Sequence, residues 1–351
     1  MSASKEEWRS PYGGTGKRGW VDASPRHRCP VCNGDSWCQI LGDGSVVLCK
    51  RHDSGRGRVN RAGVTYYVHR DESAARTWAP MAPMGPRPSD RRASPDVLDT
   101  AYSSLLHGLC LDGSDRETLR ARGLDDAAIA RAGYRTLPLR GRAALARAVM
   151  ESLYGDPETD PGIPGIVRKE EAGRGWWSLA GAPGILIPVR DLEGRIMALK
   201  VRRPDPCEGP RYLYLTSTKD GGPSAASVLH VPVAARALRE TADTLVVTEG
   251  ELKADVATHL LGKPVVGVPG VGSWALALDL AKARRPARVV VAFDMDRKTK
   301  PPVAAAQREL IRALRLAGWD GKAVGSWSWP PQWKGIDDYL AARARGEVAG
   351  V

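Results

Sequence analysis

Two aspartates follow an uninterrupted apolar run in the C-terminal part of the chain. The stretch VVVAFDMDRK carries three consecutive valines at 289–291 and then Asp294 and Asp296. Consecutive β-branched residues without alternation are typical of a parallel strand that is buried on both faces. Alternate residues of an extended segment point the same way, so the two carboxylates can converge on one point. Two like charges held that close are costly unless a cation lies between them. The alternative is a solvated turn after the strand, in which the two carboxylates point into water.

A third carboxylate ends an earlier apolar run. The stretch TLVVTEG places Glu249 before Gly250, and a helical pattern begins directly after the glycine. Glycine allows a sharp turn there, and the free N–H groups of the new helix favour a nearby anion. If the two strands are neighbours in a sheet, Glu249, Asp294 and Asp296 face one crevice. Three carboxylates supply the hard oxygen ligands that divalent cations take, so the pattern predicts a site for Mg²⁺ or Mn²⁺.

Four of the six cysteines lie between positions 29 and 49. Cys29 and Cys32 have the spacing of a zinc knuckle, and Cys38 and Cys49 lie at the ends of an expected hairpin, WCQILGDGSVVLC. A knuckle and a hairpin together bring four ligands to one tetrahedral Zn²⁺, so we expect a structural zinc at these four thiols. His52 follows Cys49 in C-x2-H spacing and competes with Cys38 as the fourth ligand.

The overall charge favours a polyanionic partner. Lys and Arg outnumber Asp and Glu by 52 to 40 among the 351 residues, which gives a net charge of +12. Such a balance is typical of proteins that bind nucleic acid or nucleotides. No apolar run is long enough to cross a bilayer, and the first residues lack the apolar segment of a signal peptide, so we expect a cytoplasmic protein without a membrane partner.

Composition and periodicity change along the chain and predict a multidomain α/β protein. Strand and helix alternate in its C-terminal part, which is the signature of a parallel sheet with sites at the carboxyl ends of its strands. In the helical part, Ser114 and Glu117 have the spacing of a capping box. The expected segments are a flexible tail (1–25), a zinc ribbon (26–70), a Pro-, Ala- and Arg-rich linker (71–95), a helical segment (96–155), a basic α+β subdomain (156–238) and the parallel-sheet domain (239–345).

The parallel-sheet domain resembles the TOPRIM domain that bacterial DnaG-type primases share with topoisomerases and some nucleases. The resemblance lies in EG after the first strand, VPGVGSW after the second and DMD after the third. It implies a Rossmann-like sheet in which Glu249, Asp294 and Asp296 are catalytic metal ligands. The ending KGIDDYL resembles the closing motif of primase-like TOPRIM proteins of phages and mobile elements, which adds Asp337 and Asp338 to the acidic site. The alternative for these two residues is a helix N-cap and first turn.

The preceding stretches GILIPVRDLEGRIMALKVRR and GPRYLYLTS resemble the segment before TOPRIM in DnaG-type primases. Gly194, between two strand-like runs, predicts a hairpin there. For the basic residues, the resemblance implies roles in binding the nucleotide and the template, although an ordinary surface charge is the alternative for each. These residues are Arg190, Lys200, Arg202, Arg211 and Lys253.

The resemblance as a whole implies a primase-like nucleotidyltransferase with an N-terminal zinc ribbon, encoded by a phage, plasmid or other mobile element. Such an enzyme makes short primers on single-stranded DNA from nucleoside triphosphates by metal-dependent phosphoryl transfer. Basic and aromatic residues around the ribbon would grip the template. A TOPRIM nuclease and a non-catalytic accessory protein that binds single-stranded DNA are the alternatives. The chain has no true Walker A motif, so a replicative helicase would be a separate partner.

Overall fold

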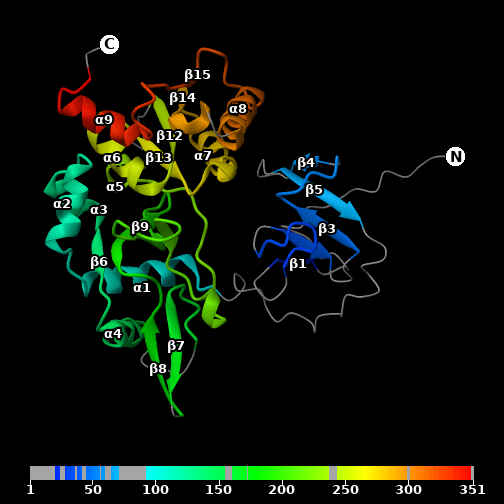
Figure 1. Ribbon diagram of the computed structural model, residues 1–351. Coiled ribbons are helices and arrows are strands. Elements are labelled where there is room, and N and C mark those ends of the chain that lie inside the picture. Colours follow the sequence, from blue (N-terminus) through cyan, green and yellow to red (C-terminus); the bar gives the residue numbers. More distant parts are fainter. Residues whose placement is uncertain are drawn as a thin grey trace. The chain divides into compact units, whose positions relative to one another are not determined.

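The chain forms two compact units, Met1–Gly85 and Pro86–Val351 (Figure 1). The expected tail at 1–25 and the expected linker at 71–95 fall mostly outside the residues that the structure describes. The computed structural model describes residues 20–23, 28–35, 38–41, 45–55, 57–59, 65–70, 92–154, 160–171, 173–236, 243–298 and 301–348. Among these residues, no helix is both long enough and apolar enough to span a bilayer.

The first unit contains a five-stranded antiparallel sheet in the order β1-β2-β3-β5-β4. The hairpin expected between Cys38 and Cys49 is confirmed as β2 and β3. Residues 20–22 were expected in the tail, but they pair with β2 as an edge strand. A strand of three residues is too short to show an alternating pattern in the sequence. The strands are β1 (Trp20–Asp22), β2 (Gln39–Leu41), β3 (Val46–Cys49), β4 (Gly57–Val59) and β5 (Thr65–Arg70).

The second unit begins with four helices, of which α1 and α4 share a core with the sheet that follows. The helices are α1 (Pro95–His107), α2 (Gly113–Ala121), α3 (Asp126–Ala132) and α4 (Arg142–Tyr154). The capping-box prediction is wrong, because α2 begins one residue before Ser114 and Glu117 instead pairs with Arg120. Strand β6 (Arg135–Leu137) interrupts the expected helical segment and joins the next sheet by pairing with β9.

This next sheet has four strands in the order β11-β10-β9-β6. The hairpin predicted around Gly194 is confirmed, since β9 and β10 are antiparallel and Gly194 has a φ of 93°. The neighbouring elements are β7 (Ile166–Glu171), β8 (Arg174–Leu179), β9 (Gly184–Arg190), β10 (Ile196–Arg202), β11 (Tyr212–Tyr214), η2 (Thr218–Asp220) and α5 (Val233–Arg236). Of these, β7 and β8 form a separate two-stranded hairpin.

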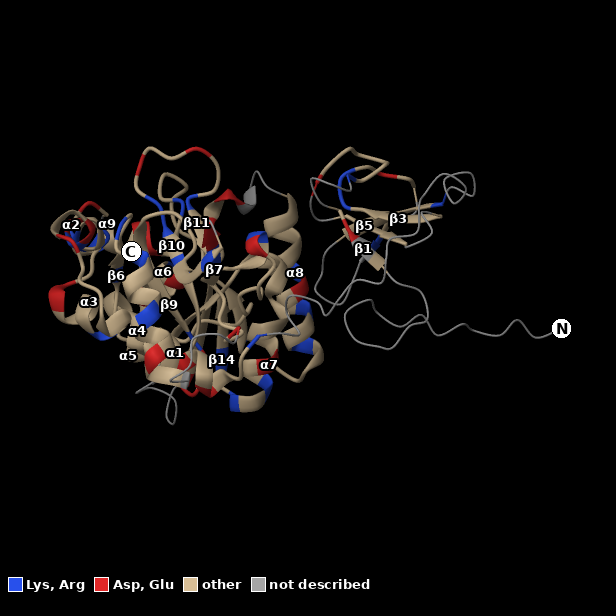
Figure 2. Cartoon of the chain, turned by 90° about the horizontal axis from the view of Figure 1, so that it is seen from below, with Lys and Arg blue, Asp and Glu red and all other residues tan. Residues whose placement is uncertain are grey.

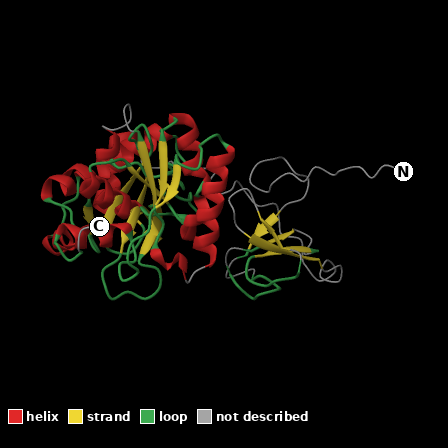
Figure 3. Ribbon diagram, turned by 90° about the horizontal axis from the view of Figure 1, so that it is seen from above, coloured by secondary structure: helices red, strands yellow, loops and turns green. Residues whose placement is uncertain are grey.

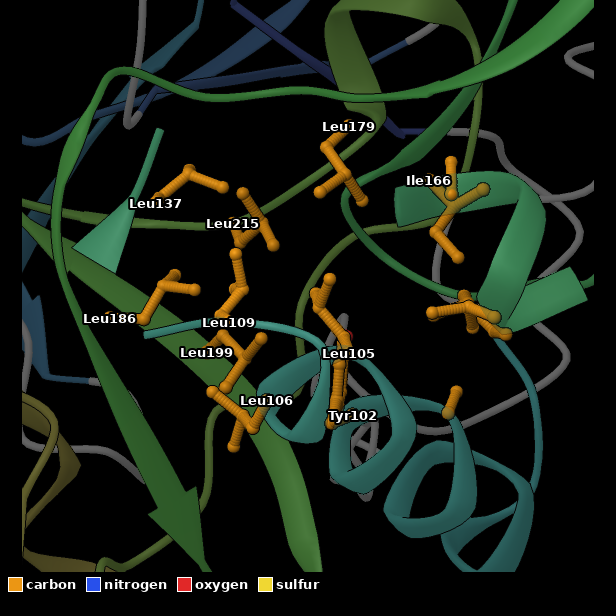
Figure 4. Close-up of a cluster of buried hydrophobic side chains, with 14 of the residues drawn as sticks. Tyr102, Leu105, Leu106, Leu109, Leu137, Ile166, Leu179, Leu186, Leu199 and Leu215 are labelled. Atoms are coloured by element: carbon orange, nitrogen blue, oxygen red, sulfur yellow. The ribbon is translucent and has the colours of Figure 1, made fainter. Parts of the chain in front are cut away.

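The helical segment and this sheet share one hydrophobic core. Tyr102 and Leu105 of α1 belong to the same cluster of buried side chains as Leu186 of β9 and Leu199 of β10 (Figure 4). A boundary near residue 155 therefore does not separate two cores, because the apolar face of α1 has no other surface to cover.

The last part of the unit is a parallel sheet in the order β13-β12-β14-β15. Helices cover both of its faces (Figure 3). Val247 and Val289 belong to the core that contains α7 and α8, whereas Val246 belongs to the core that contains α6 and α9. Burial on both faces explains the continuous apolar runs of the sequence. The elements are β12 (Thr244–Glu249), α6 (Glu251–Leu261), β13 (Val265–Val268), η3 (Val271–Ser273), α7 (Ala275–Arg284), β14 (Arg288–Val291), η4 (Met295–Lys298), α8 (Pro301–Leu316), β15 (Val324–Ser326) and α9 (Ile336–Ala344).

A fourth core ties the parallel sheet to the rest of the unit. Leu119 and Tyr134 of the helical segment pack with Ile185 of β9 and Val256 of α6. Tyr134 also donates a hydrogen bond from its hydroxyl to Asp255 in α6, at 2.5 Å. The helical segment is thus placed against the helix that follows Glu249.

Candidate active site and metal centre

The acidic residues lie at one edge of the parallel sheet. The expectation that their strands are neighbours is confirmed, since β12 and β14 pair with Val247 opposite Val291. Glu249 ends β12, and Asp294 follows β14 after two further buried residues. Gly250 turns the chain from β12 into α6 with a φ of 89°, which favours glycine. Carboxylates from the two strands therefore reach the same end of the sheet.

Lysine side chains lie among these carboxylates. Lys253, in the first turn of α6, donates from Nζ to both carboxylate oxygens of Asp294 at 2.6 Å. Lys334 Nζ lies 3.8 Å from Asp294 and 3.6 Å from Asp296. The Asp294 side chain is only 3% exposed, whereas that of Lys334 is 61% exposed. The acidic edge therefore contains one deeply placed ammonium group and one at its surface.

The charge on Glu249 is coupled to the aspartate pair. Burial raises the pKa of Glu249, and the charges of Asp294 and Asp296 raise it further, while Lys253 and Lys334 act in the opposite direction. Glu249 therefore lies among charges of both signs.

The spacing of the carboxylates is looser than that of the cysteines. Among the described residues, only the four cysteines bring three or more metal-binding side chains to within 4.8 Å of one another. The donor chemistry of Glu249, Asp294 and Asp296 fits Mg²⁺ or Mn²⁺, which bind carboxylates and keep several waters. The direct ligands of such an ion remain a prediction.

Asp337 and Asp338 occupy the first turn of α9 and have different partners. Asp338 accepts a hydrogen bond from the N–H of Gly335 at 3.1 Å, as expected for the first turn of a helix. Asp337 is buried and forms an ion pair with Arg122, which follows α2. Burial raises the pKa of Asp337, although Arg122 and Lys253 oppose that shift. Arg122 was missed because no motif surrounds it, and only the tertiary fold brings it to this edge.

The predicted nucleotide-binding residues are placed differently from one another. Lys200 is buried, pairs with Glu251 of α6 at 2.7 Å and lies over the ring of Tyr214. Arg202 and Arg211 both pair with Asp205, at 3.1 Å and 2.6 Å. Arg211 is 49% exposed, but the Arg202 side chain is 9% exposed. The segment between β10 and β11 therefore carries acidic as well as basic residues (Figure 2).

Arg190, at the end of β9, makes a local contact. Its Nη1 donates to the backbone oxygen of Gly194 at 3.2 Å, across the hairpin that the glycine forms. Its backbone N–H donates to Nδ1 of the buried His230 at 3.1 Å. The guanidinium thus bridges the hairpin, and the peptide N–H connects the end of β9 to His230.

The four cysteines of the first unit form a compact group. The Sγ atoms of Cys32 and Cys38 are 3.7 Å apart, and those of Cys38 and Cys49 are 3.8 Å apart. The ring of His52 is not part of the group, although its backbone N–H donates to Cys49 Sγ at 3.3 Å. Four sulfur ligands and N–H donors to a thiolate are the chemistry of a structural Zn²⁺ site, so the residues fit that metal.

The thiols differ in how readily they ionise. Burial would raise the pKa of Cys32, but the backbone N–H of Gly34 and the guanidinium of Arg51 lower it to about 6. Burial raises the pKa of Cys38 to about 12. Zinc must therefore displace a strongly held proton from Cys38 when it binds.

Comparison of the chain with solved structures identifies its fold as similar to that of primase domains. Residues 237–347 match a family that is described as a domain of unknown function (DUF3854). No curated protein matches the chain. The zinc-binding and RNA polymerase domains of the Aquifex aeolicus primase are similar to it, with a TM-score of 0.54 and 15% identity over 95% of this chain and 77% of that one.

Two further solved structures have comparable similarity. A DnaG primase catalytic domain bound to single-stranded DNA has a TM-score of 0.51 and 19% identity, over 72% of this chain and 76% of its own. The RNA polymerase domain of the Mycobacterium tuberculosis primase, in complex with double-stranded DNA, has a TM-score of 0.51 and 18% identity, over 73% and 80%. The chain therefore has the mixed α/β fold of primase zinc-binding and RNA polymerase domains.

Proposed function

We propose that the chain is a primase-like nucleotidyltransferase that makes short primers on single-stranded DNA. The observation that supports this most strongly is the convergence of Glu249, Asp294 and Asp296 at one edge of the parallel sheet, from neighbouring strands. A four-cysteine module in the same chain and the primase-like fold add to it. The TOPRIM assignment of the sheet, and a phage, plasmid or other mobile element as the source, belong to this proposal and are supported by the sequence motifs.

In this proposal the three carboxylates hold a divalent cation. When bound, Mg²⁺ or Mn²⁺ supplies positive charge that orients a triphosphate and stabilises the transferring phosphoryl group. Lys253 holds Asp294 through both of its oxygens, and the exposed Lys334 at the surface of the site is available to a phosphate oxygen. The substrates are nucleoside triphosphates and a single-stranded template, and a replicative helicase would be a separate partner.

The placement of the basic residues refines their proposed roles. The ammonium of Lys200 is buried against Glu251, so this residue stabilises the contact between β10 and α6. Arg211 is accessible and lies beyond the same strand, where it can contact a template phosphate. Of the basic residues first assigned to nucleotide and template binding, we therefore favour Arg211 for the template contact.

The proposal is tested by one assay that separates three outcomes. The full chain is incubated with end-labelled single-stranded DNA, nucleotides carrying a second label, and Mg²⁺ or Mn²⁺. We expect template-dependent oligomers from the wild type, and a loss on the order of 100-fold in Asp294→Ala. Asp243→Asn is the matched control, since this exposed carboxylate lies before the amino end of β12, away from the site.

The other two outcomes contradict primer synthesis. Shortened DNA without new oligomers, lost in Asp294→Ala, would favour a TOPRIM nuclease that uses the same carboxylates. Binding of DNA with neither product would favour a non-catalytic accessory protein.

A further inference from the structure

The side chain of Lys253 lies inside the acidic site. Its Nζ donates to both oxygens of Asp294 at 2.6 Å, and its side chain is 22% exposed. Charge-assisted hydrogen bonds to both oxygens of one carboxylate fix the orientation of that carboxylate. The ammonium therefore takes the place, next to Asp294, that a cation bound to both oxygens would take.

The backbone near Lys253 leaves space for this side chain. A Cβ atom on Gly335 would lie 3.3 Å from Lys253 Cε and would collide with Oδ1 of Asp337. The φ of Gly335 is −96°, which other residues adopt readily, so the need for glycine here comes from space. The start of α9 thus leaves space beside the lysine side chain.

The hydrogen bonds of Lys253 limit what the acidic edge can bind. Both oxygens of Asp294 accept from its ammonium, so a second divalent cation at this carboxylate would have to displace the lysine. Lys334, with a 61% exposed side chain, can move aside when an ion binds beside Asp296.

We propose that Lys253 is a permanent internal cation of the site, which positions Asp294 and limits the acidic cluster to one divalent cation, held by Glu249, Asp296 and one oxygen of Asp294. This inference deepens the proposed function and rests on it. Lys253 is a positioning residue, because it acts through Asp294. Asp294 is then held in its working orientation before any ion or nucleotide arrives.

Counting bound Mn²⁺ by electron paramagnetic resonance tests the inference. The full chain, loaded with zinc, is titrated with Mn²⁺ as wild type, Lys253→Met and the matched control Lys263→Met, an exposed lysine just beyond the far end of α6. We expect one Mn²⁺ per chain in the wild type, lost in Asp296→Asn. Lys253→Met is expected to bind a second Mn²⁺, while Lys263→Met binds one.

Two tight Mn²⁺ ions in the wild type would overturn the inference, as would a Lys253→Met protein that binds one ion with unchanged affinity. Circular dichroism and zinc content report whether Lys253→Met folds. If it does not fold, Lys253→Gln is titrated in its place, with the same two outcomes. Mn²⁺ is also expected to raise the melting temperature of either neutral variant more than that of the wild type.

The ion count is independent of primer synthesis. A chain that makes primers but binds two ions overturns only this inference. A chain that binds one ion under the control of Lys253, and makes no primers, overturns only the proposed function.

Discussion

The two metal-binding regions proposed for this chain are built in opposite ways. The four thiols come from one short stretch, between Cys29 and Cys49, and converge on one another. The carboxylates come from β12, β14 and α9, far apart in the sequence, and Lys253 and Arg122 lie among them. From this difference we expect that the cysteine module depends on a bound metal to fold, whereas the acidic edge, which contains its own cationic side chains, does not.

Removing zinc is expected to have the largest effect and to separate the two regions. The described core of the first unit is small, and three of its six buried residues are cysteines, so we expect most of its stability to come from the metal, about 10 kcal/mol or more. Chelation, or Cys38→Ser, is expected to unfold the first unit and to leave the second folded. Zinc content and limited proteolysis measure this, with the exposed Cys110→Ser as the control.

If chelation unfolds both units, the second unit also depends on zinc, and the proposed difference between the two regions is wrong. If the first unit stays protease-resistant without zinc, its strands are stable by themselves, and the proposed dependence on the metal is wrong.

Substitution of the aspartates is expected to lower the free energy of unfolding by less than zinc removal does, and by different amounts for Asp294 and Asp296. Asp294→Ala removes the acceptor of both hydrogen bonds from Lys253, whose side chain is 22% exposed, which costs about 3 kcal/mol in the second unit. Asp296→Asn, at a side chain that is 18% exposed, is expected to change the free energy of unfolding much less. Urea denaturation of both variants measures the difference. Equal stabilities would mean that Lys253 does not hold Asp294 as the structure indicates.

The buried pair between Lys200 and Glu251 sharpens the comparison further. Glu251→Gln keeps the shape and an acceptor oxygen but removes the charge, so we expect a loss of about 2 kcal/mol. The same variant is expected to bind single-stranded DNA as the wild type does, because neither side chain is accessible. Weaker DNA binding of Glu251→Gln with unchanged stability would instead favour Lys200 as a template-binding residue.

The smallest effect on stability is expected at Arg211. Its pair with Asp205 is about half exposed, so Arg211→Ala should cost less than about 1 kcal/mol. We expect it to weaken DNA binding and to reduce the salt dependence by about one phosphate contact. Fluorescence anisotropy at several salt concentrations measures this, with Arg312→Ala as the control, since Arg312 lies on the exposed face of α8 and pairs only locally with Glu309. An unchanged salt dependence would exclude Arg211 from the template contact.

Much of the parallel sheet was predictable from the sequence, because its strands are buried on both faces and their apolar runs are continuous. The positions of Glu249 and Asp294 at neighbouring strand ends followed from that. The strand at 135–137 was not predictable, since three residues show no period and its pairing with β9 is set by the tertiary fold. The partners of Asp337 and Lys200 were hidden for the same reason, because a basic residue in a motif can face either solvent or a buried carboxylate.

The most direct test of the central claim is nucleotide incorporation on single-stranded DNA under saturating Mg²⁺, compared between Asp296→Asn and Asp243→Asn. Asp296→Asn alters a carboxylate at the carboxyl edge of the sheet, and Asp243→Asn alters one before the opposite end of β12. If the acidic edge binds the ion that drives phosphoryl transfer, only Asp296→Asn loses incorporation, on the order of 100-fold, while its fold and zinc content are unchanged. Equal incorporation by the two variants would contradict the account.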